Sequence, residues 1–208
     1  MAASPVVAVV DYESGNLCSV SKALEKLGAT VCIVSSPEGI PSADALVLPG
    51  VGAFRDAMHK LERLELVDPI REAIDSGKPF FGICLGLQLL FAEGLEDGVT
   101  PGLGVLPGRV VRFELDDPSL KIPHMGWNRL AIRQRTPVLE GLDEETWVYF
   151  VHSYYVAPED DSVIATTTDY GIDFTSSVAR DNVFASQFHP EKSQSVGLAM
   201  LENFLKTV

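Results

Sequence analysis

The sequence predicts an α/β fold with a mixed, mainly parallel central sheet, helices on both faces and an antiparallel extension in the C-terminal half. Three observations lead to this prediction. Continuous β-branched runs alternate with amphipathic helical segments in the first half, as in a parallel sheet. Closely spaced strand candidates replace the helices in the second half. The length of 208 residues is expected for a single domain, 1–208.

The elements of the first half follow one another in regular order. Val6–Val10 is a β-branched run, as expected for a strand that is buried on both faces. A helix is expected over Asn16–Leu27, and Gly28 is its C-terminal stop. The elements expected next are strands at Thr30–Val34 and Ala45–Leu48 and helices at Ala53–Leu66 and Pro69–Ser76.

A strand-to-helix junction lies near the middle of the chain. Pro79–Ile83 is typical of a buried strand, Leu85–Phe91 is expected to be helical, and Cys84 stands between them. With Gly82 and Gly86 on either side, the pattern is that of a nucleophile elbow with sulfur in place of a serine hydroxyl. An isolated cysteine is more often a small core residue, so a second signal is needed.

The second half is expected to consist mainly of strands. Loops are predicted over Gly94–Gly108 and Lys121–Asn128, and Ser193 is expected to be the N-cap of a final helix. The strand candidates are Arg109–Leu115, Leu130–Arg133, Trp147–Val151, Tyr154–Ala157, Ser162–Thr168, Ser176–Ala179 and Val183–Gln187.

The second signal is the tetrapeptide Phe188–Glu191, which follows a predicted strand. His189 and Glu191 stand two residues apart, so both side chains project to the same side of an extended segment. A histidine oriented by a carboxylate can take the proton of a thiol. Separately, these residues would be read as a surface histidine and a solvated carboxylate. Together with Cys84 they predict a Cys-His-Glu triad that the fold assembles.

Pro49–Gly52 comes directly after the third predicted strand. Ligands of open α/β sheets bind at the carboxyl ends of strands, and glycines let backbone N–H groups approach a ligand closely. The segment is either an oxyanion hole or a plain turn, and the tetrapeptide alone favours the turn.

The composition excludes several classes of protein. A formal net charge of −13 argues against binding to nucleic acid or to an anionic membrane. Cys18, Cys32 and Cys84 include no close pair, so neither a disulfide framework nor a metal cluster is expected. This cysteine usage is typical of a reducing compartment and predicts a cytoplasmic protein.

The cysteine and histidine motifs together resemble those of the class I glutamine amidotransferases. The resemblance rests on Gly82–Gln88 and Phe188–Glu191, and it extends from about Val6 to the last helix. It implies a flavodoxin-like arrangement of the sheet. It also implies hydrolysis of L-glutamine through a cysteinyl thioester, with no cofactor and no metal.

The resemblance implies catalytic roles for three side chains. Cys84 would be the nucleophile, His189 the general base and then acid, and Glu191 the group that orients His189. A further set is implied to form the oxyanion hole or to hold the two ends of the glutamine: Gly50, Val51, Gly52, Leu85, Gln88, Ser153 and Tyr154.

Two further stretches, Asp11–Leu17 and Ile122–Asn128, resemble those members of the family that supply ammonia for histidine biosynthesis. They imply a heterodimer with a cyclase (synthase) subunit, a (β/α)8 barrel that binds the phosphorylated acceptor and receives the ammonia. The residues implied to lie near that interface are Asn16, His124, Trp127 and Asn128. Glu13 departs from the pattern, because the family usually has glycine there.

The resemblance also implies that the subunit is nearly inactive alone. A peptide of Pro49–Gly52 would rotate toward the oxyanion only when the partner's substrate is bound, so a β-branched residue at Gly50 should suppress activation. Other readings stay open: an amidotransferase for anthranilate, guanylate or pyridoxal phosphate synthesis, a stand-alone thiol hydrolase of γ-glutamyl compounds, or an inactive binding module. The stretch Ile122–Asn128 argues against the first group, and the complete triad argues against the last.

Overall fold

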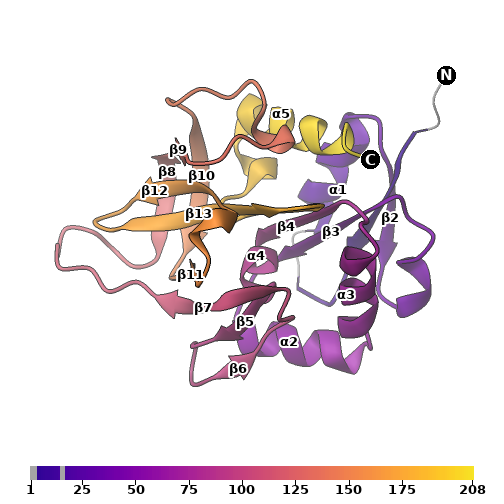
Figure 1. Cartoon of the computed structure of the whole chain (residues 1–208), viewed down its shortest axis with the longest axis horizontal. Helices are drawn as coiled ribbons and strands as arrows, with labels where there is room; N and C mark the ends of the chain where they lie inside the picture. The colour runs from indigo at the N-terminus through magenta and orange to yellow at the C-terminus, as the bar shows by residue number, and fades with distance from the viewer. Residues whose placement is uncertain (1–3, 15–16) are drawn as a thin grey trace.

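The computed structural model describes residues 4–14 and 17–208, and their main feature is a 12-stranded sheet (Figure 1). One half of the sheet is parallel throughout and has the strand order β2-β1-β3-β4-β14. These strands are β2 (Thr30–Val34), β1 (Val6–Val10), β3 (Ala45–Gly50), β4 (Phe80–Cys84) and β14 (Val183–Ser186).

The other half of the sheet is the predicted antiparallel extension, in which only β5 and β7 pair in parallel. It continues from β14 through β13 (Asp173–Arg180), β11 (Tyr154–Pro158), β7 (Leu106–Arg112), β5 (Phe91–Gly94) and β6 (Thr100–Pro101), with β12 (Ile164–Asp169) and β9 (Ala131–Ile132) branching from β13. A separate antiparallel pair consists of β8 (His124–Arg129) and β10 (Trp147–His152). The mixed α/β fold is therefore confirmed.

Helices cover both faces of the parallel half, as Figure 1 shows. Side chains alternate along a strand, so Val7 and Val9 of β1 pack on one face and Ala8 and Val10 on the other. Helices α1 (Leu17–Lys26) and α5 (Gln194–Leu205) cover the first face, while α2 (Phe54–Arg63) and α3 (Val67–Asp75) cover the second.

Aromatic side chains form the centre of the face beneath α5. Phe81 is fully buried, and its ring lies 5.2 Å from that of Phe184 and 5.3 Å from that of Phe204. Burying a side chain of this size stabilises the folded state by about 1.5–3 kcal/mol. This packing fixes the position of β4, the strand that ends at Cys84.

Two predicted boundaries differ from those of the structure. The helix expected over Leu85–Phe91 is shorter, because α4 covers Leu85–Leu89 and Phe91 begins β5. A continuous apolar run has no period that separates a buried helix from a buried strand. The predicted strand at Ala45–Leu48 continues to Gly50, so Pro49 and Gly50 form its end and not a turn after it.

Two predicted loops contain strands. The segment Gly94–Gly108 contains β6 and the beginning of β7, so the strand expected over Arg109–Leu115 begins and ends three residues earlier. The segment Lys121–Asn128 contains most of β8. Its glycine and proline masked the strand, which exists because each residue of β8 pairs with one of β10.

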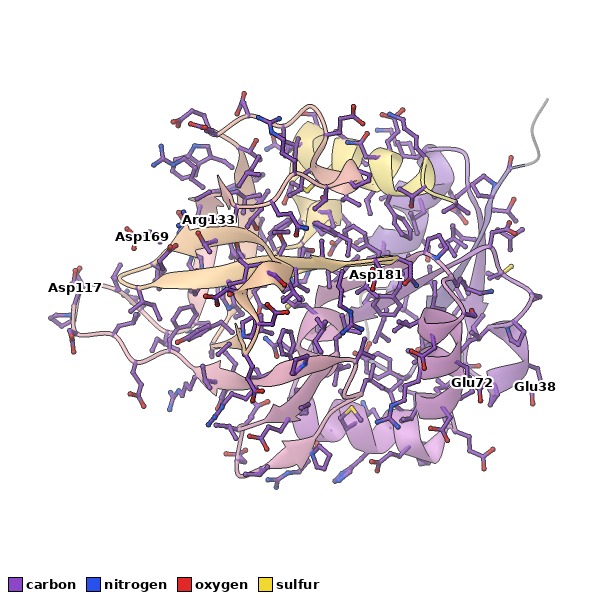
Figure 2. All side chains as sticks on the ribbon, in the orientation of Figure 1. Glu38, Glu72, Asp117, Arg133, Asp169 and Asp181 are labelled. Carbon is purple, nitrogen blue, oxygen red and sulfur yellow. The ribbon has the colours of Figure 1, made fainter. Side chains whose placement is uncertain are left out.

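Acidic side chains lie around the outside of the molecule. Figure 2 labels Glu38, Glu72 and Asp117 at its periphery, and all three are exposed. Within the described residues, no helix combines the length and the apolar character needed to cross a bilayer.

Candidate active site

The turn from β4 into α4 holds Cys84 in a conformation that few residues adopt. Its φ is 55° and its ψ is −104°, a region that costs a non-glycine residue about 1–3 kcal/mol. A Cβ at Gly86 would collide with the carbonyl oxygen of Leu48, and one at Gly82 would lie 2.9 Å from the Cβ of Ala185. Both glycines are therefore required, and the geometry is that of the predicted elbow.

His189 and Glu191 lie side by side beyond the end of β14. The Nδ1 atom of His189 is 2.9 Å from Oε1 of Glu191, and both side chains are buried. The backbone N–H of His189 donates to the carbonyl of Tyr149, so the imidazole is also held through the main chain. The carboxylate fixes the orientation of the ring and leaves Nε2 for the thiol.

Ser193 has a different role from the one predicted. It stands at the N-cap position of α5, but its hydroxyl makes no capping hydrogen bond. The hydroxyl donates to the carbonyl of His189 at 2.7 Å and accepts from the N–H of Tyr149 at 3.0 Å. It therefore joins the backbone of the histidine to strand β10.

Cys84 and Glu191 determine the charge of His189. Burial alone would lower the pKa of His189, but the charge and proximity of Cys84 and the contact with Glu191 together raise that pKa to about 10. These contacts favour the protonated imidazole, which is the form that can donate a proton to a leaving group.

A cavity of about 350 Å³ opens above the elbow. Its lining contains most of the site residues predicted from the sequence: Val51, Gly52, Cys84, Leu85, Gln88, Ser153, Tyr154 and His189. Four further residues that were not predicted to be site residues also line it: Glu96, Pro123, Val151 and His152. Gly50 and Glu191 support this lining from behind, since Gly50 pairs with Cys84 across β3 and β4.

Gln88 connects two sides of the cavity. Its side-chain amide donates to the carbonyl of Tyr154 at 3.1 Å and to the side-chain oxygen of Gln187 at 3.0 Å. The amide of Gln187 in turn lies 3.6 Å from the sulfur of Cys84. Sequence reasoning missed Gln187, because nothing in the strand motif before His189 distinguishes it from a core residue.

Glu96 is the acidic residue in the lining of this cavity that the sequence did not predict. Its Oε2 atom accepts from the backbone N–H of Phe54 at the start of α2, which fixes the side chain in place. A carboxylate in a cavity attracts a cationic group of a ligand. Glu96 lies in the segment predicted to be a loop, and its sequence neighbours contain no motif that would have identified it.

His124 and His152 form a buried chain of neutral imidazoles beside the cavity. His152 Nδ1 lies 2.8 Å from the carbonyl of Tyr154 and therefore carries a proton. Its Nε2 accepts from His124 Nδ1 at 3.0 Å, and the side-chain amide of Asn128 lies 3.3 Å from His124 Nε2. Burial lowers the pKa of His124 to about 4 and that of His152 to about 3.

The residues predicted near a partner interface differ in their surroundings. His124 is buried, with its ring stacked on that of Tyr170. Trp127 is 43% exposed, and Asn128 is half-buried and donates to the carbonyl of Asp169. Asn16 lies outside the described residues.

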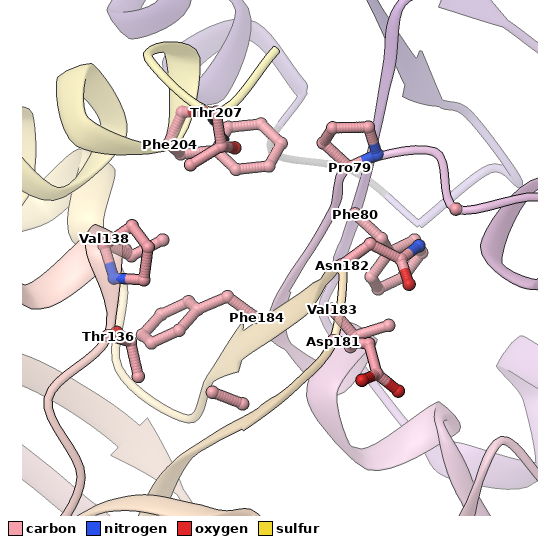
Figure 3. A pocket seen from close by; sticks show the side chains of 13 residues that line it. Pro79, Phe80, Thr136, Val138, Asp181, Asn182, Val183, Phe184, Phe204 and Thr207 are labelled. Carbon is pink, nitrogen blue, oxygen red and sulfur yellow. Dashed lines mark hydrogen bonds between the residues drawn. The ribbon is translucent and has the colours of Figure 1, made fainter.

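A second cavity, of about 340 Å³, lies at the opposite end of the central strands, where β4 and β14 begin (Figure 3). The labelled rings of Phe80, Phe184 and Phe204 form much of its wall, with Asp181 and Asn182 on one side. None of the cysteines and histidines, all of which are among the described residues, lines it. The cavity above the elbow is therefore the candidate active site.

Comparison with known proteins defines the class of this chain. Residues 8–208 match the model of the Glutamine amidotransferase class-I family. The chain superimposes on the structure described as that of PurLQS from Thermotoga maritima with a TM-score of 0.78 and 21% identity, covering 98% of this chain and 99% of the other. A crystal structure described as a glutamine amidotransferase gives a TM-score of 0.75 at 24% identity, covering 97% and 99%. The chain belongs to the class I glutamine amidotransferases.

Curated relatives define the family more narrowly. Imidazole glycerol phosphate synthase subunit HisH of Aquifex aeolicus is 58% identical, with 94% of each chain covered. The subunits of the same name from Syntrophotalea carbinolica and Thermosynechococcus vestitus are each 54% identical, covering 96% and 99% of this chain and 98% of each relative. Within its class, the chain belongs to the family of subunit HisH.

Proposed function

We propose that this chain is the glutaminase subunit of imidazole glycerol phosphate synthase and hydrolyses L-glutamine to glutamate and ammonia. The observation that supports this most strongly is the convergence of Cys84, His189 and Glu191 at one cavity. These residues are remote in sequence, since Gln187, two residues before His189, is 103 residues from Cys84. Such a nucleophile, base and orienting carboxylate are what acyl transfer needs.

The reaction follows from the roles of these groups. The thiolate of Cys84 attacks the side-chain amide carbon of glutamine, and a carbon–sulfur bond forms as the carbonyl oxygen becomes an oxyanion. His189, protonated and held by Glu191, donates its proton to the leaving nitrogen, and ammonia departs. The imidazole then takes a proton from water, which attacks the thioester and releases glutamate and the thiolate.

The oxyanion needs hydrogen-bond donors beside Cys84. The backbone N–H of Leu85 stands directly after the nucleophile, and Val51 and Gly52 line the same cavity. We propose that a peptide of this segment rotates to supply the second donor. Each such donor contributes about 3–4 kcal/mol to transition-state stabilisation.

The walls of the cavity suit the amino-acid end of glutamine. The Glu96 carboxylate provides the negative charge that the α-ammonium group requires, and the polar side chains and backbone of Gln88, Ser153 and Tyr154 complete the binding surface. Glu96 is an addition to the substrate-binding residues predicted from the sequence.

One surface suits the transfer of ammonia to a partner. On the pair β8–β10, Met125, Trp127 and Trp147 expose 62%, 43% and 50% of their surfaces. Their partners in register include Val151, which also lines the cavity, so this face continues to the cavity. We propose that a cyclase subunit of (β/α)8-barrel type covers this face in a heterodimer and receives the ammonia there.

The partner would carry out the rest of the synthesis. With the ammonia it receives, it would convert PRFAR to imidazole glycerol phosphate and AICAR in histidine biosynthesis. We expect the assembly in the cytoplasm, because Cys18 and Cys32 are exposed thiols and Cys84 must stay reduced. Neither nucleic acid nor a membrane is part of the proposal, since the net charge of −13 opposes binding to anionic surfaces.

The direct test is the variant Cys84→Ala in the complex with the cyclase. Glutamine-dependent synthesis should disappear while ammonia-dependent synthesis remains at the wild-type rate. The matched control is Cys18→Ala, an exposed cysteine on α1, which should leave both activities unchanged. Retained glutamine-dependent synthesis in Cys84→Ala would overturn the proposal, and rapid glutamine hydrolysis by the isolated wild-type chain would favour a stand-alone hydrolase.

A further inference from the structure

Tyr12 is a buried phenol whose hydroxyl has no evident structural use. The side chain is 0% exposed, and the hydroxyl makes no hydrogen bond of ordinary geometry with the described residues. The hydroxyl of Ser14 approaches that of Tyr12 and by itself would lower the pKa of the phenol, but it too makes no hydrogen bond of ordinary geometry with the described residues. A buried hydroxyl without a partner costs about 1–3 kcal/mol, and phenylalanine would fill the same space without that cost.

The position of this hydroxyl is unusual. A Cβ at Gly50 would collide with the oxygen of Tyr12 and lie 2.9 Å from the Cβ of Leu85. The hydroxyl therefore occupies the space that a side chain at Gly50 would fill. Neither Tyr12 nor Gly50 lines the cavity, and Tyr12 is fully buried, so the contact between them lies behind the cavity lining.

The proposed rotation of the oxyanion segment changes what Tyr12 faces. In a trans peptide the N–H and the C=O point in opposite directions. When the peptide between Gly50 and Val51 turns its N–H toward Cys84, the carbonyl of Gly50 turns away from the cavity, to the buried side. A carbonyl buried there needs a donor.

We infer, on the basis of the glutaminase function proposed above, that the Tyr12 hydroxyl is the donor that stabilises the rotated, active peptide by hydrogen bonding to the Gly50 carbonyl. Tyr12 is thus a positioning residue, which never touches the substrate. Burial and the charge of Cys84 raise the pKa of this phenol, so it keeps the proton that it must donate.

The test is Tyr12→Phe in the complex with the cyclase and its acceptor substrate. The variant should lower kcat for glutamine hydrolysis by about tenfold, less than the loss of an oxyanion donor itself would, and leave KM unchanged. Its thermal unfolding midpoint should be equal or higher, because a buried hydroxyl without a partner has been removed.

A second measurement separates positioning from packing. The probe is glutamate γ-semialdehyde. The thiol of Cys84 adds to its aldehyde carbon, and the oxygen of the resulting tetrahedral adduct lies in the oxyanion hole. Glutamate itself forms no such adduct. Tyr12→Phe should weaken inhibition by the aldehyde about tenfold and leave inhibition by glutamate unchanged.

The matched control is Tyr170→Phe, whose hydroxyl donates to the carbonyl of Lys121. It should be less stable than wild type and equally active, the opposite pattern to Tyr12→Phe. A Tyr12→Phe variant with wild-type kcat and aldehyde affinity would overturn the inference while leaving the glutaminase function intact. That function fails only if Cys84→Ala retains glutamine-dependent synthesis.

Discussion

His124 and His152 show how a pair of histidines can be both buried and well satisfied. Each ring nitrogen has a partner, and the sequence of donors runs from Asn128 through both rings to the carbonyl of Tyr154. Protonation of either ring would place two donors against each other. Burial lowers the pKa of both rings, and this arrangement leaves their neutral forms fully hydrogen-bonded.

This pair predicts a loss of stability in acid. The pKa of His124 is about 4 in the folded protein against about 6.5 unfolded, so its contribution is complete above pH 6.5 and is lost as pH falls toward 4. His124→Phe should be less stable than wild type at pH 8 by about 1–3 kcal/mol. The gap should narrow by up to about 1.4 kcal/mol per pH unit below 6.5, as urea unfolding at pH 8 and pH 5 would measure.

His59 provides the control for this experiment, because it is an exposed histidine on α2. His59→Gln should be about as stable as wild type at pH 8, because it removes no buried side chain. A His124→Phe variant whose deficit is the same at pH 5 and pH 8 would contradict the prediction.

Short motifs single out the side chains proposed to be catalytic, whereas some of their neighbours in the structure have no such signal. Cys84 stands in a local pattern of glycines, and His189 and Glu191 stand two residues apart, so short motifs reveal all three. Glu96 reaches the cavity from a segment without a motif, and Tyr12 is brought to Gly50 only by the pairing of β1 with β3. Their surroundings are tertiary, so no local pattern encodes them.

At the scale of the element, the backbone conformation at the end of β3 bears directly on the proposed reaction. Gly50 ends the strand beside Cys84, and Gly52 has a φ of +100° just before α2 begins. A residue at Gly50 would collide with Tyr12, whichever way the following peptide points. Activity lost through a β-branched residue at Gly50 could therefore come from disturbed packing or from a blocked peptide rotation. Substitution of Gly52 tests the rotation without the packing effect.

We predict that Gly52→Ala slows glutamine hydrolysis in the complex by about tenfold or more. Apart from its chain neighbours, no heavy atom of the described residues lies within 4 Å of an ideal Cβ at Gly52. Its positive φ is nevertheless strained for alanine, which restricts the conformations of the oxyanion segment. Gly28→Ala is a closely matched control, with a φ of +94° and equal space at the end of α1.

Both variants should lose about 1 kcal/mol of unfolding free energy, and only Gly52→Ala should lose activity. Steady-state glutamate release and thermal unfolding on the same preparations would check this. Equal activity in the two variants would show that the conformation of Gly52 has no part in catalysis.

Helices and strands with a clear local sequence pattern could be predicted, whereas those that depend on tertiary pairing could not. The β-branched run Val6–Val10 matches β1 residue for residue. Strand β8 was missed, because His124–Arg129 contains no β-branched residue and becomes a strand by pairing with β10. The apolar run after Cys84 gave a helix two residues too long, since burial removes the periodicity that marks where a helix ends.

At the scale of the whole molecule, the exposed tryptophans share one surface. Carboxylates are spread around the periphery (Figure 2), while exposed tryptophans gather on the β8–β10 pair. An apolar patch among charges is typical of a surface that a partner covers. Its continuity with the cavity through Val151 gives the patch a functional meaning.

We predict that Trp127→Ala weakens association with the cyclase by at least about 2 kcal/mol, or roughly thirtyfold in Kd, because a large aromatic side chain at the centre of an interface dominates binding. Glutamine hydrolysis should fall at low partner concentration and recover at saturation. Titration of the partner, followed by glutamate release, measures both quantities.

Ile33 offers the control for this experiment. It is 56% exposed and lies on β2, an edge strand of the 12-stranded sheet, whereas β8 and β10 form a separate sheet. Ile33→Ala should bind the cyclase as wild type does. If the two variants bind equally well, the partner covers another surface.

The hydroxyl of Ser193 has a mechanical consequence. Together with the N–H of His189, it connects the backbone of that residue to Tyr149 through hydrogen bonds on both sides. Tyr149 is the direct neighbour of Trp127 across the ladder. We therefore expect a protein that docks on this ladder to shift the backbone of His189 through these hydrogen bonds, which would couple partner binding to the position of the imidazole.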